Sequence, residues 1–294
     1  MHKYGINRPT VCRDFRLVRH PRLNRQAIAY LILGVTVFFA IFPVFWVASI
    51  AFKGQQEWFA RPLHWLPSMP TLVNFVAAFS NRNGANAVLN SLMAAAGGTL
   101  VALLVGYPAA YAMSRYRTRK LPLFIVPLIL RATPPVVIAV PLLLFYSPLG
   151  LVDTVAGLIP VYAATTVFYI IWLIKPFIDA VPREIEEAAM ADGVRHWRIP
   201  FSVVLPIVSG GLAAATTFVF ILNWTEFSIA LTLTRLYAET IPVQMTTLTS
   251  LYSVLGNGQS AALSTASMIP FLFIAYYLQK LLLRSFFVGA VRGE

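Results

Sequence analysis

Long apolar runs alternate with short polar segments along this chain of 294 residues. The first run extends from Ala29 to Phe52, and a helix of that length is long enough to cross a bilayer core of about 30 Å. Comparable runs predict five further spanning helices, at about residues 87–113, 121–146, 156–174, 203–234 and 261–283. The pattern therefore predicts an all-α membrane protein with six transmembrane helices.

The composition supports this prediction. The chain is 58% hydrophobic and only 12% charged, with a mean hydropathy of +0.72. Soluble domains rarely have such values, and apolar runs of 20 or more residues are typical of membrane spans. We expect one bundle of membrane helices and no soluble domain.

The net charge of +12 is distributed unequally between the two sides of the predicted bundle. Residues 1–27, the loop after the second span, the loop near residues 175–198 and the C-terminal end hold eighteen lysines and arginines. The opposite side holds only Lys53, Arg61, Arg82 and Arg235. Cytoplasmic loops carry such an excess, so both termini are expected in the cytoplasm. Most of the positive charge is then explained by the orientation of the bundle in the membrane, and we expect no nucleic-acid partner.

Residues 1–27 form a basic cytoplasmic arm in this interpretation. Its arginines recur at every third position from 13 to 25, which winds them around a helix and leaves no single charged face. Basic segments next to a span are attracted to anionic lipid. Membrane lipid is therefore the expected partner of this arm.

The sequence contains few groups that bind metals or nucleotides. Cys12 is the only cysteine, and the four histidines are scattered without metal-ligand spacing. No G-x-x-x-x-G-K-[ST] motif is present, so the chain is not expected to bind nucleotide phosphates. No nucleophile and base are arranged for catalysis. We predict no metal site, no cofactor bound by this chain and no enzyme activity.

A charged hairpin at about residues 180–206 lies between two predicted spans. Pro182 suits the first turn of a short helix, and Gly193 can adopt the left-handed conformation that ends one. Between them, Ile185, Ala188, Ala189 and Asp192 follow helical spacing. They would make a small, nearly flat face for another protein to approach, whereas the alternative is a solvated loop.

This hairpin resembles the EAA loop of ABC-importer permeases. That pattern reads EAA, three residues, Gly, nine residues, then Ile-x-Leu-Pro; here it begins at Glu187, has Gly193, and differs only in Val203 for Ile. Further stretches resemble the carbohydrate-uptake branch, of the maltose-type second permease, over roughly residues 28–293. They are Asn90-Ser91, Arg131 before Pro134-Pro135, Leu149-Gly150-Leu151 with Asp153-Thr154, Asn223-Trp224-Thr225-Glu226-Phe227 and the tail Gly289–Gly293.

The resemblance implies a type I ABC importer permease in the bacterial inner membrane. Its six-helix domain would span residues 28–284, and a cytoplasmic tail would span residues 285–294. The implied partners are a homologous second permease, two ABC ATPase subunits that use ATP and Mg, and a periplasmic or lipid-anchored solute-binding protein. The implied ATPase-coupling residues are Glu186, Glu187, Ala188, Ala189, Asp192 and Gly193.

Candidate pathway residues lie in the predicted spans. Prolines interrupt the third span, and broken helices at membrane depth usually face protein or a water-filled cavity. Arg131 and Glu226 are ionisable groups at membrane depth, where charges are costly. They either line the pathway or pair with each other or the backbone. The polar or aromatic residues that could contact a sugar are Tyr146, Asn223, Trp224 and Tyr252, with packing as the alternative for the aromatic rings.

The last outer loop, residues 235–260, resembles the one that reaches into the binding protein. Gly256, Asn257 and Gly258 are expected to give it a flexible tip.

The cargo is expected to be a sugar or oligosaccharide. The slight basic excess of the outer loops leaves an acidic oligosaccharide or a glycerol-phosphate-like polyol open. Two other classes are an ion-coupled carrier and a membrane scaffold that does not transport. A carrier usually shows repeated halves and several midplane acids. This chain has one such acid, and its proline-broken third span argues against a scaffold.

Overall fold

The computed structural model describes residues 22–58, 60–80, 82–116, 134–249 and 256–290. By its internal contacts the chain divides into a unit of residues 1–45 and a unit of residues 46–294. All packing discussed below lies within the second unit.

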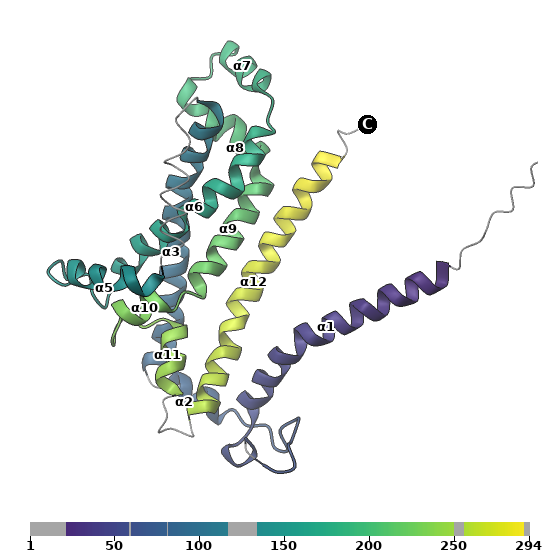
Figure 1. Ribbon diagram of the computed structural model, residues 1–294, viewed down its shortest axis with the longest axis vertical. Coiled ribbons are helices and arrows are strands. Elements are labelled where there is room, and N and C mark those ends of the chain that lie inside the picture. Colours follow the sequence, from purple (N-terminus) through teal and green to yellow (C-terminus); the bar gives the residue numbers. More distant parts are fainter. Residues whose placement is uncertain (1–21, 59, 81, 117–133, 250–255, 291–294) are drawn as a thin grey trace, which may run out of the picture. The chain divides into compact units, whose positions relative to one another are not determined.

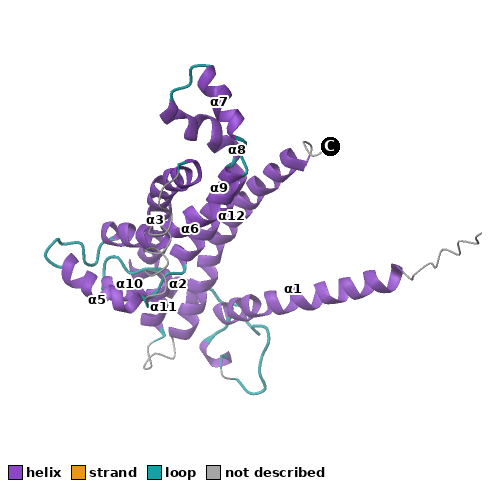
Figure 2. Cartoon of the chain, turned by 45° about the horizontal axis from the view of Figure 1, so that its top comes forward, coloured by secondary structure: helices purple, strands orange, loops and turns teal. Residues whose placement is uncertain are grey.

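Helices make up all the regular structure in the described residues, and Figure 2 shows them joined by loops, the longest of which lies beside α1. The long helices are α1 (Arg22–Phe52), α3 (Arg82–Arg115), α6 (Val155–Asp179), α9 (Ser209–Trp224) and α12 (Gly256–Ala290). The shorter ones are α2 (Val73–Ser80), α5 (Pro135–Tyr146), α7 (Arg183–Ala191), α8 (Leu205–Ile207), α10 (Ser228–Leu233) and α11 (Ile241–Leu248). Single helical turns occupy Gln55–Glu57, His196–Arg198 and Pro200–Val204.

Length and hydropathy agree with the predicted spans in most places. Within the described ranges, Gln26–Phe52, Gly84–Arg115 and Val155–Asp179 are long and apolar enough to cross a membrane. A bent pair, His196–Ile207 with Ser209–Trp224, would be a fourth, and Val137–Tyr146 is a shorter apolar helix. That helix is the described part of the predicted third span. Helix α12 covers the predicted sixth span and continues to Ala290, so the start of the predicted tail is helical.

The predicted fifth span, residues 203–234, is wrong as one continuous helix. Pro200–Val204 forms a π-helical turn, Val208 leaves the helical conformation, and the helices on either side meet at 85°. Pro206 has no N–H for an intrahelical bond, which explains a break here. Helix α9 ends at Trp224, and α10 begins only at Ser228. The first break lies in an apolar stretch and is hidden by its hydropathy, whereas the second lies at the polar residues Thr225 and Glu226.

The core forms where α3, α6 and α9 pack against one another and α12 packs against α9. Helix α6 buries Ile170, Ile174 and Ile178 at four-residue spacing. Small residues allow close approach: a Cβ on Gly98 would lie 2.7 Å from Tyr162 Cβ. Such close packing stabilises helix pairs in a bilayer. Figure 1 shows α7 at one end of these helices and α10 and α11 at the other.

Candidate functional site

Helix α7 is the exposed element at one end of the bundle. It begins after Pro182, and Glu184 and Glu186 lie in its first turn, where carboxylates complement the helix dipole. It ends as the sequence predicts, because Gly193 adopts a left-handed conformation with φ of 86°. The Gly193 N–H donates to the Met190 carbonyl, which satisfies one group at the helix end.

The exposed face of α7 is small and partly apolar. Glu187, Ala188, Asp192 and Gly193 are exposed, and Ala189 is half-buried. Exposed apolar side chains beside them are Ile185, Met190, Trp197 and Phe201. A hollow of about 540 Å³ lies at the C-terminal end of this helix, lined by Asp192, Gly193, Val194, Arg195, Arg198 and Ser202. The face is therefore open to another protein, while its ATPase-coupling role stays a prediction.

Glu186 does not share this exposed face, which corrects its grouping with the surface residues. Its side chain is buried and forms an ion pair with Arg115, with Nε and Oε1 2.6 Å apart. The Tyr111 hydroxyl donates to the other carboxylate oxygen over 2.6 Å. One residue advances a helix by about 100°, so adjacent glutamates can face in and out. The two partners of Glu186 lie more than 70 positions away in sequence, where spacing gives no signal.

Three predicted pathway residues are buried inside this chain. Asn223 donates to the Thr99 hydroxyl over 3.2 Å. Trp224 stacks on Phe220, and Tyr146 belongs to an apolar cluster around Leu158. The sequence left packing open as the alternative for the aromatic rings. Their burial favours packing in this conformation.

Glu226 contacts backbone amides at the start of α10. Oε1 accepts the Ile229 N–H over 2.9 Å, and Oε2 accepts the Ala230 N–H over 3.1 Å. This is the backbone-pairing alternative, in which a carboxylate satisfies the open donors of a helix start. Arg131 and Tyr252 lie outside the described residues, so their predicted pathway roles stay predictions.

The predicted flexible tip of the last outer loop is wrong for its glycines. Gly256, Asn257 and Gly258 form the first turn of α12. Gly258 is buried, and a Cβ there would lie 2.1 Å from the Trp58 ring and 2.5 Å from Asn74 Oδ1. Gly258 is thus a packing glycine that lets α12 approach the 53–74 segment. Composition alone does not distinguish such a glycine from a mobile one.

Asp153 organises part of the end of the bundle opposite α7 (Figure 1). Its carboxylate accepts N–H bonds from the consecutive residues Arg235, Leu236, Tyr237 and Ala238. Burial raises the pKa of Asp153, but these amide bonds outweigh it and hold the pKa below its ordinary value. Asn90 donates to the carbonyls of Tyr237 and Glu239. The segment after α10 is therefore held by hydrogen bonds to both Asp153 and Asn90.

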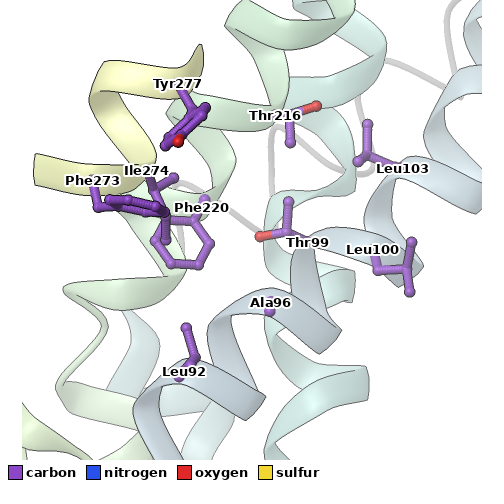
Figure 3. A pocket seen from close by; sticks show the side chains of 10 residues that line it. All are labelled: Leu92, Ala96, Thr99, Leu100, Leu103, Thr216, Phe220, Phe273, Ile274 and Tyr277. Carbon is purple, nitrogen blue, oxygen red and sulfur yellow. The ribbon is translucent and has the colours of Figure 1, made fainter. Parts of the chain in front are cut away.

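An apolar groove of about 440 Å³ lies between α3, α9 and α12 (Figure 3). Its lining has three hydroxyls, of Thr99, Thr216 and Tyr277, and two are already engaged, because Thr99 accepts from Asn223 and Thr216 donates to the Leu212 carbonyl. Other lining residues are Leu92, Ala96, Leu100, Leu103, Phe220, Phe273 and Ile274. Orienting a polar ligand requires well-placed polar groups. The lining therefore suits hydrocarbon better than a sugar.

Among the described residues, no three histidine, cysteine or acidic side chains are grouped so as to hold a metal ion.

Comparison with known proteins identifies the family. The model of the binding-protein-dependent transport system inner membrane component family matches residues 98–288. A probable ABC transporter permease of Sinorhizobium fredii is 29% identical over 271 residues, covering 92% of this chain and 97% of the relative. A trehalose/maltose transport system permease of Thermococcus litoralis is 29% identical over 260 residues, covering 86% and 92%.

A solved structure supports the fold. A bacterial ABC transporter that imports the acidic polysaccharide alginate contains a chain similar to this one, with a TM-score of 0.69 and 20% identity. The similarity covers 89% of this chain and 98% of that one. Together with the exposed α7 and its glycine-closed end, these matches show that the chain belongs to the binding-protein-dependent transport system inner membrane component family, the permease subunits of ABC importers.

Proposed function

We propose that this permease imports a sugar or oligosaccharide as one half of a two-permease pathway, and that α7 couples it to a cytoplasmic ATPase. The observation that carries the coupling proposal is the exposed α7 face, which has small residues at its centre and exposed apolar side chains at its edges. Apolar patches of this kind mark protein–protein contact sites. The sugar cargo is supported by the trehalose/maltose relative.

The proposed assembly contains this chain, a homologous permease, two ATPase subunits and an external solute-binding protein. ATP and Mg would bind to the ATPase subunits, because this sequence has no phosphate-binding loop of the P-loop type. Both termini and α7 would face the cytoplasm, in keeping with the lysine and arginine bias. ATP-driven closure of the ATPase pair would move α7 and rock the helices as rigid bodies.

The coupling proposal predicts that Ala188→Arg uncouples ATP hydrolysis from uptake. A long charged side chain would prevent close approach to the exposed face of α7. In proteoliposomes containing the complete importer, we expect uptake to fall at least tenfold while the permease still inserts and assembles with its partner permease. The exposed Ala180, just before α7, provides a matched control, and Ala180→Arg should retain uptake. Wild-type uptake in the Ala188→Arg complex would contradict the coupling role.

An acidic cargo receives less support from the outer charges than the sequence suggested. Lys53, one of the four basic residues on that side, is fully buried and donates to the His64 carbonyl. It also lies 4.8 Å from the centre of the Trp46 ring, and burial lowers its pKa against the opposing effect of Glu57. Its charge is committed to this contact and is not displayed to an approaching anion. The acidic alternative therefore rests on the alginate-importing structural relative.

Two measurements test the proposed cargo and energy source. Binding assays on the companion solute-binding protein should detect a neutral sugar or oligosaccharide, and exclusive binding of an acidic one would select the alternative. Uptake should require ATP and persist when ion gradients are collapsed. Uptake that is lost when the ion gradients are collapsed and that does not depend on ATP would indicate an ion-coupled carrier instead.

A further inference from the structure

The guanidinium of Arg115 lies where three helices meet. Arg115 is the last residue of α3, and its Nε pairs with Glu186 of α7. Its Nη2 donates to the carbonyls of Ile178 and Val181 over 3.0 and 2.9 Å, at the end of α6. Its Nη1 lies 3.3 Å from the Ser114 hydroxyl, so all three nitrogens have a partner. One side chain thus joins α3, α6 and α7.

Two tyrosines extend this junction along α3. Tyr107, Tyr111 and Arg115 are four residues apart, so they lie on one face of the helix. The Tyr111 hydroxyl donates to Glu186, and the Tyr107 hydroxyl donates to the Pro200 carbonyl on the far limb of the hairpin. Both tyrosines are buried. The same face of α3 therefore holds the hairpin on both sides of its exposed tip.

The connection from the hairpin to α9 is different. The chain passes through the π-helical turn of Pro200–Val204 and the short α8, then bends by 85° before α9 begins at Ser209. The hairpin and α9 therefore do not form one straight helix, and a proline and a π-helical turn at the bend account for the change in direction. The side-chain bonds of Arg115 and Tyr111 thus link α7 directly to α3 and to the end of α6, whereas the chain reaches α9 only through this bend.

We propose that Arg115 is a positioning residue that makes α3, α6 and α7 one mechanical body, so that displacement of α7 enters the bundle through the α3–α6 pair. The inference rests on the proposed coupling function of α7. Tyr111 and Glu186 complete the junction, which is buried and so protected from competing water.

The geometry explains why arginine is needed at this position. Its planar fork has five N–H donors in fixed directions, and three of them reach acceptors on α6, on α7 and on Val181 between these helices. A lysine keeps the charge and nearly the length but has one ammonium on a flexible stem. Lysine can pair with Glu186 or cap α6, but it cannot hold both in the observed directions.

The experiment compares Arg115→Lys with the wild type in proteoliposomes that contain the complete importer. Uptake and ATP hydrolysis are measured in the same vesicles, and complex yield is measured separately. We expect a normal yield, with cargo transported per ATP hydrolysed at least fivefold lower. Arg61→Lys is the matched control, since it makes the same exchange at an exposed arginine outside this junction. That control should keep the wild-type ratio.

The outcomes separate positioning from simple stability. A lower yield of Arg115→Lys complex with an unchanged transport-to-hydrolysis ratio would overturn the proposal, because it describes a purely structural residue. If too little Arg115→Lys complex assembles to measure cargo transported per ATP hydrolysed, the same measurement is made on Tyr111→Phe. That substitution removes only the hydroxyl that orients Glu186. We expect a two- to threefold lower ratio for Tyr111→Phe, and an unchanged ratio would again overturn the proposal. A wild-type complex without ATP-dependent uptake would instead reject the proposed function.

Discussion

Replacing Gly258 by leucine is expected to destabilise the start of α12 and its contacts by about 3 kcal/mol, at the upper end of the usual cost of overpacking. The Cβ alone would lie 2.1 Å from the Trp58 ring, and the rest of the leucine side chain would have to fit beyond this clash. Trp58 cannot move freely, because its indole N–H donates to the Lys53 carbonyl over 3.2 Å. The ring would have to give up this bond or push α12 outward.

Thermal unfolding in detergent, followed by intrinsic tryptophan fluorescence, measures this effect. The neighbouring Asn257 is exposed in the same helical turn, so Asn257→Leu is the matched control and should leave the unfolding temperature nearly unchanged. Equal tolerance of both substitutions would mean that Gly258 lies in a mobile tip. The flexible-loop interpretation from sequence would then be right and the packing wrong.

Asp153→Ala is expected to cost about 2 to 3 kcal/mol, because hydrogen bonds to a charged group are among the stronger ones and several are lost together. The carboxylate accepts N–H bonds from four consecutive residues after α10. Asp153 itself has a positive φ of 57°, which Asp and Asn tolerate better than alanine does. The partial exposure of the site reduces the effect below the sum of separate bonds.

The same group gives a pH dependence with a definite sign. The amide donors keep the folded pKa of Asp153 below its ordinary value of about 4, against the opposing effect of burial. The unfolded state therefore binds a proton more readily than the folded state does. This contribution to stability is fully present above pH 4 and is lost as the pH falls through the folded pKa.

Unfolding temperatures of the wild type and Asp153→Asn, measured between pH 3 and pH 7, check this prediction. Asparagine tolerates the positive φ and keeps one acceptor oxygen, but it cannot titrate. The difference between the two proteins should be largest near pH 7 and shrink below pH 4. A difference that stays constant across this range would show that the charge of Asp153 does not support the segment.

Hydropathy and charge were sufficient to predict the membrane bundle. Spanning helices depend on unbroken apolar length, and backbone groups in a bilayer must bond within the helix, so α1, α3 and α6 appear where the sequence places them. The hairpin helix was also predictable, because its limits depend on local backbone properties. Pro182 precedes it, and Gly193 ends it in the left-handed conformation.

Hydropathy was less informative where the local backbone path decides the outcome. Residues 203–234 resemble one span by hydropathy, yet the helix breaks at Val208, just after Pro206, and again between Trp224 and Ser228. The sequence left two roles open for Glu226, lining the pathway or bonding to the backbone, and its bonds to the Ile229 and Ala230 amides match the second. Both features depend on the backbone path, which hydropathy does not record.

The sequence by itself determined the membrane class, the expected orientation and the position of the exposed coupling-type hairpin, because these follow from local apolar length, charge counts and backbone preferences. Only the tertiary structure assigned opposite roles to adjacent residues, burying Glu186 against Arg115 while leaving Glu187 exposed. It also turned Gly258 into a packing contact and Asp153 into an anchor. Each of these roles requires a partner distant in sequence, and folding alone brings such partners within bonding distance.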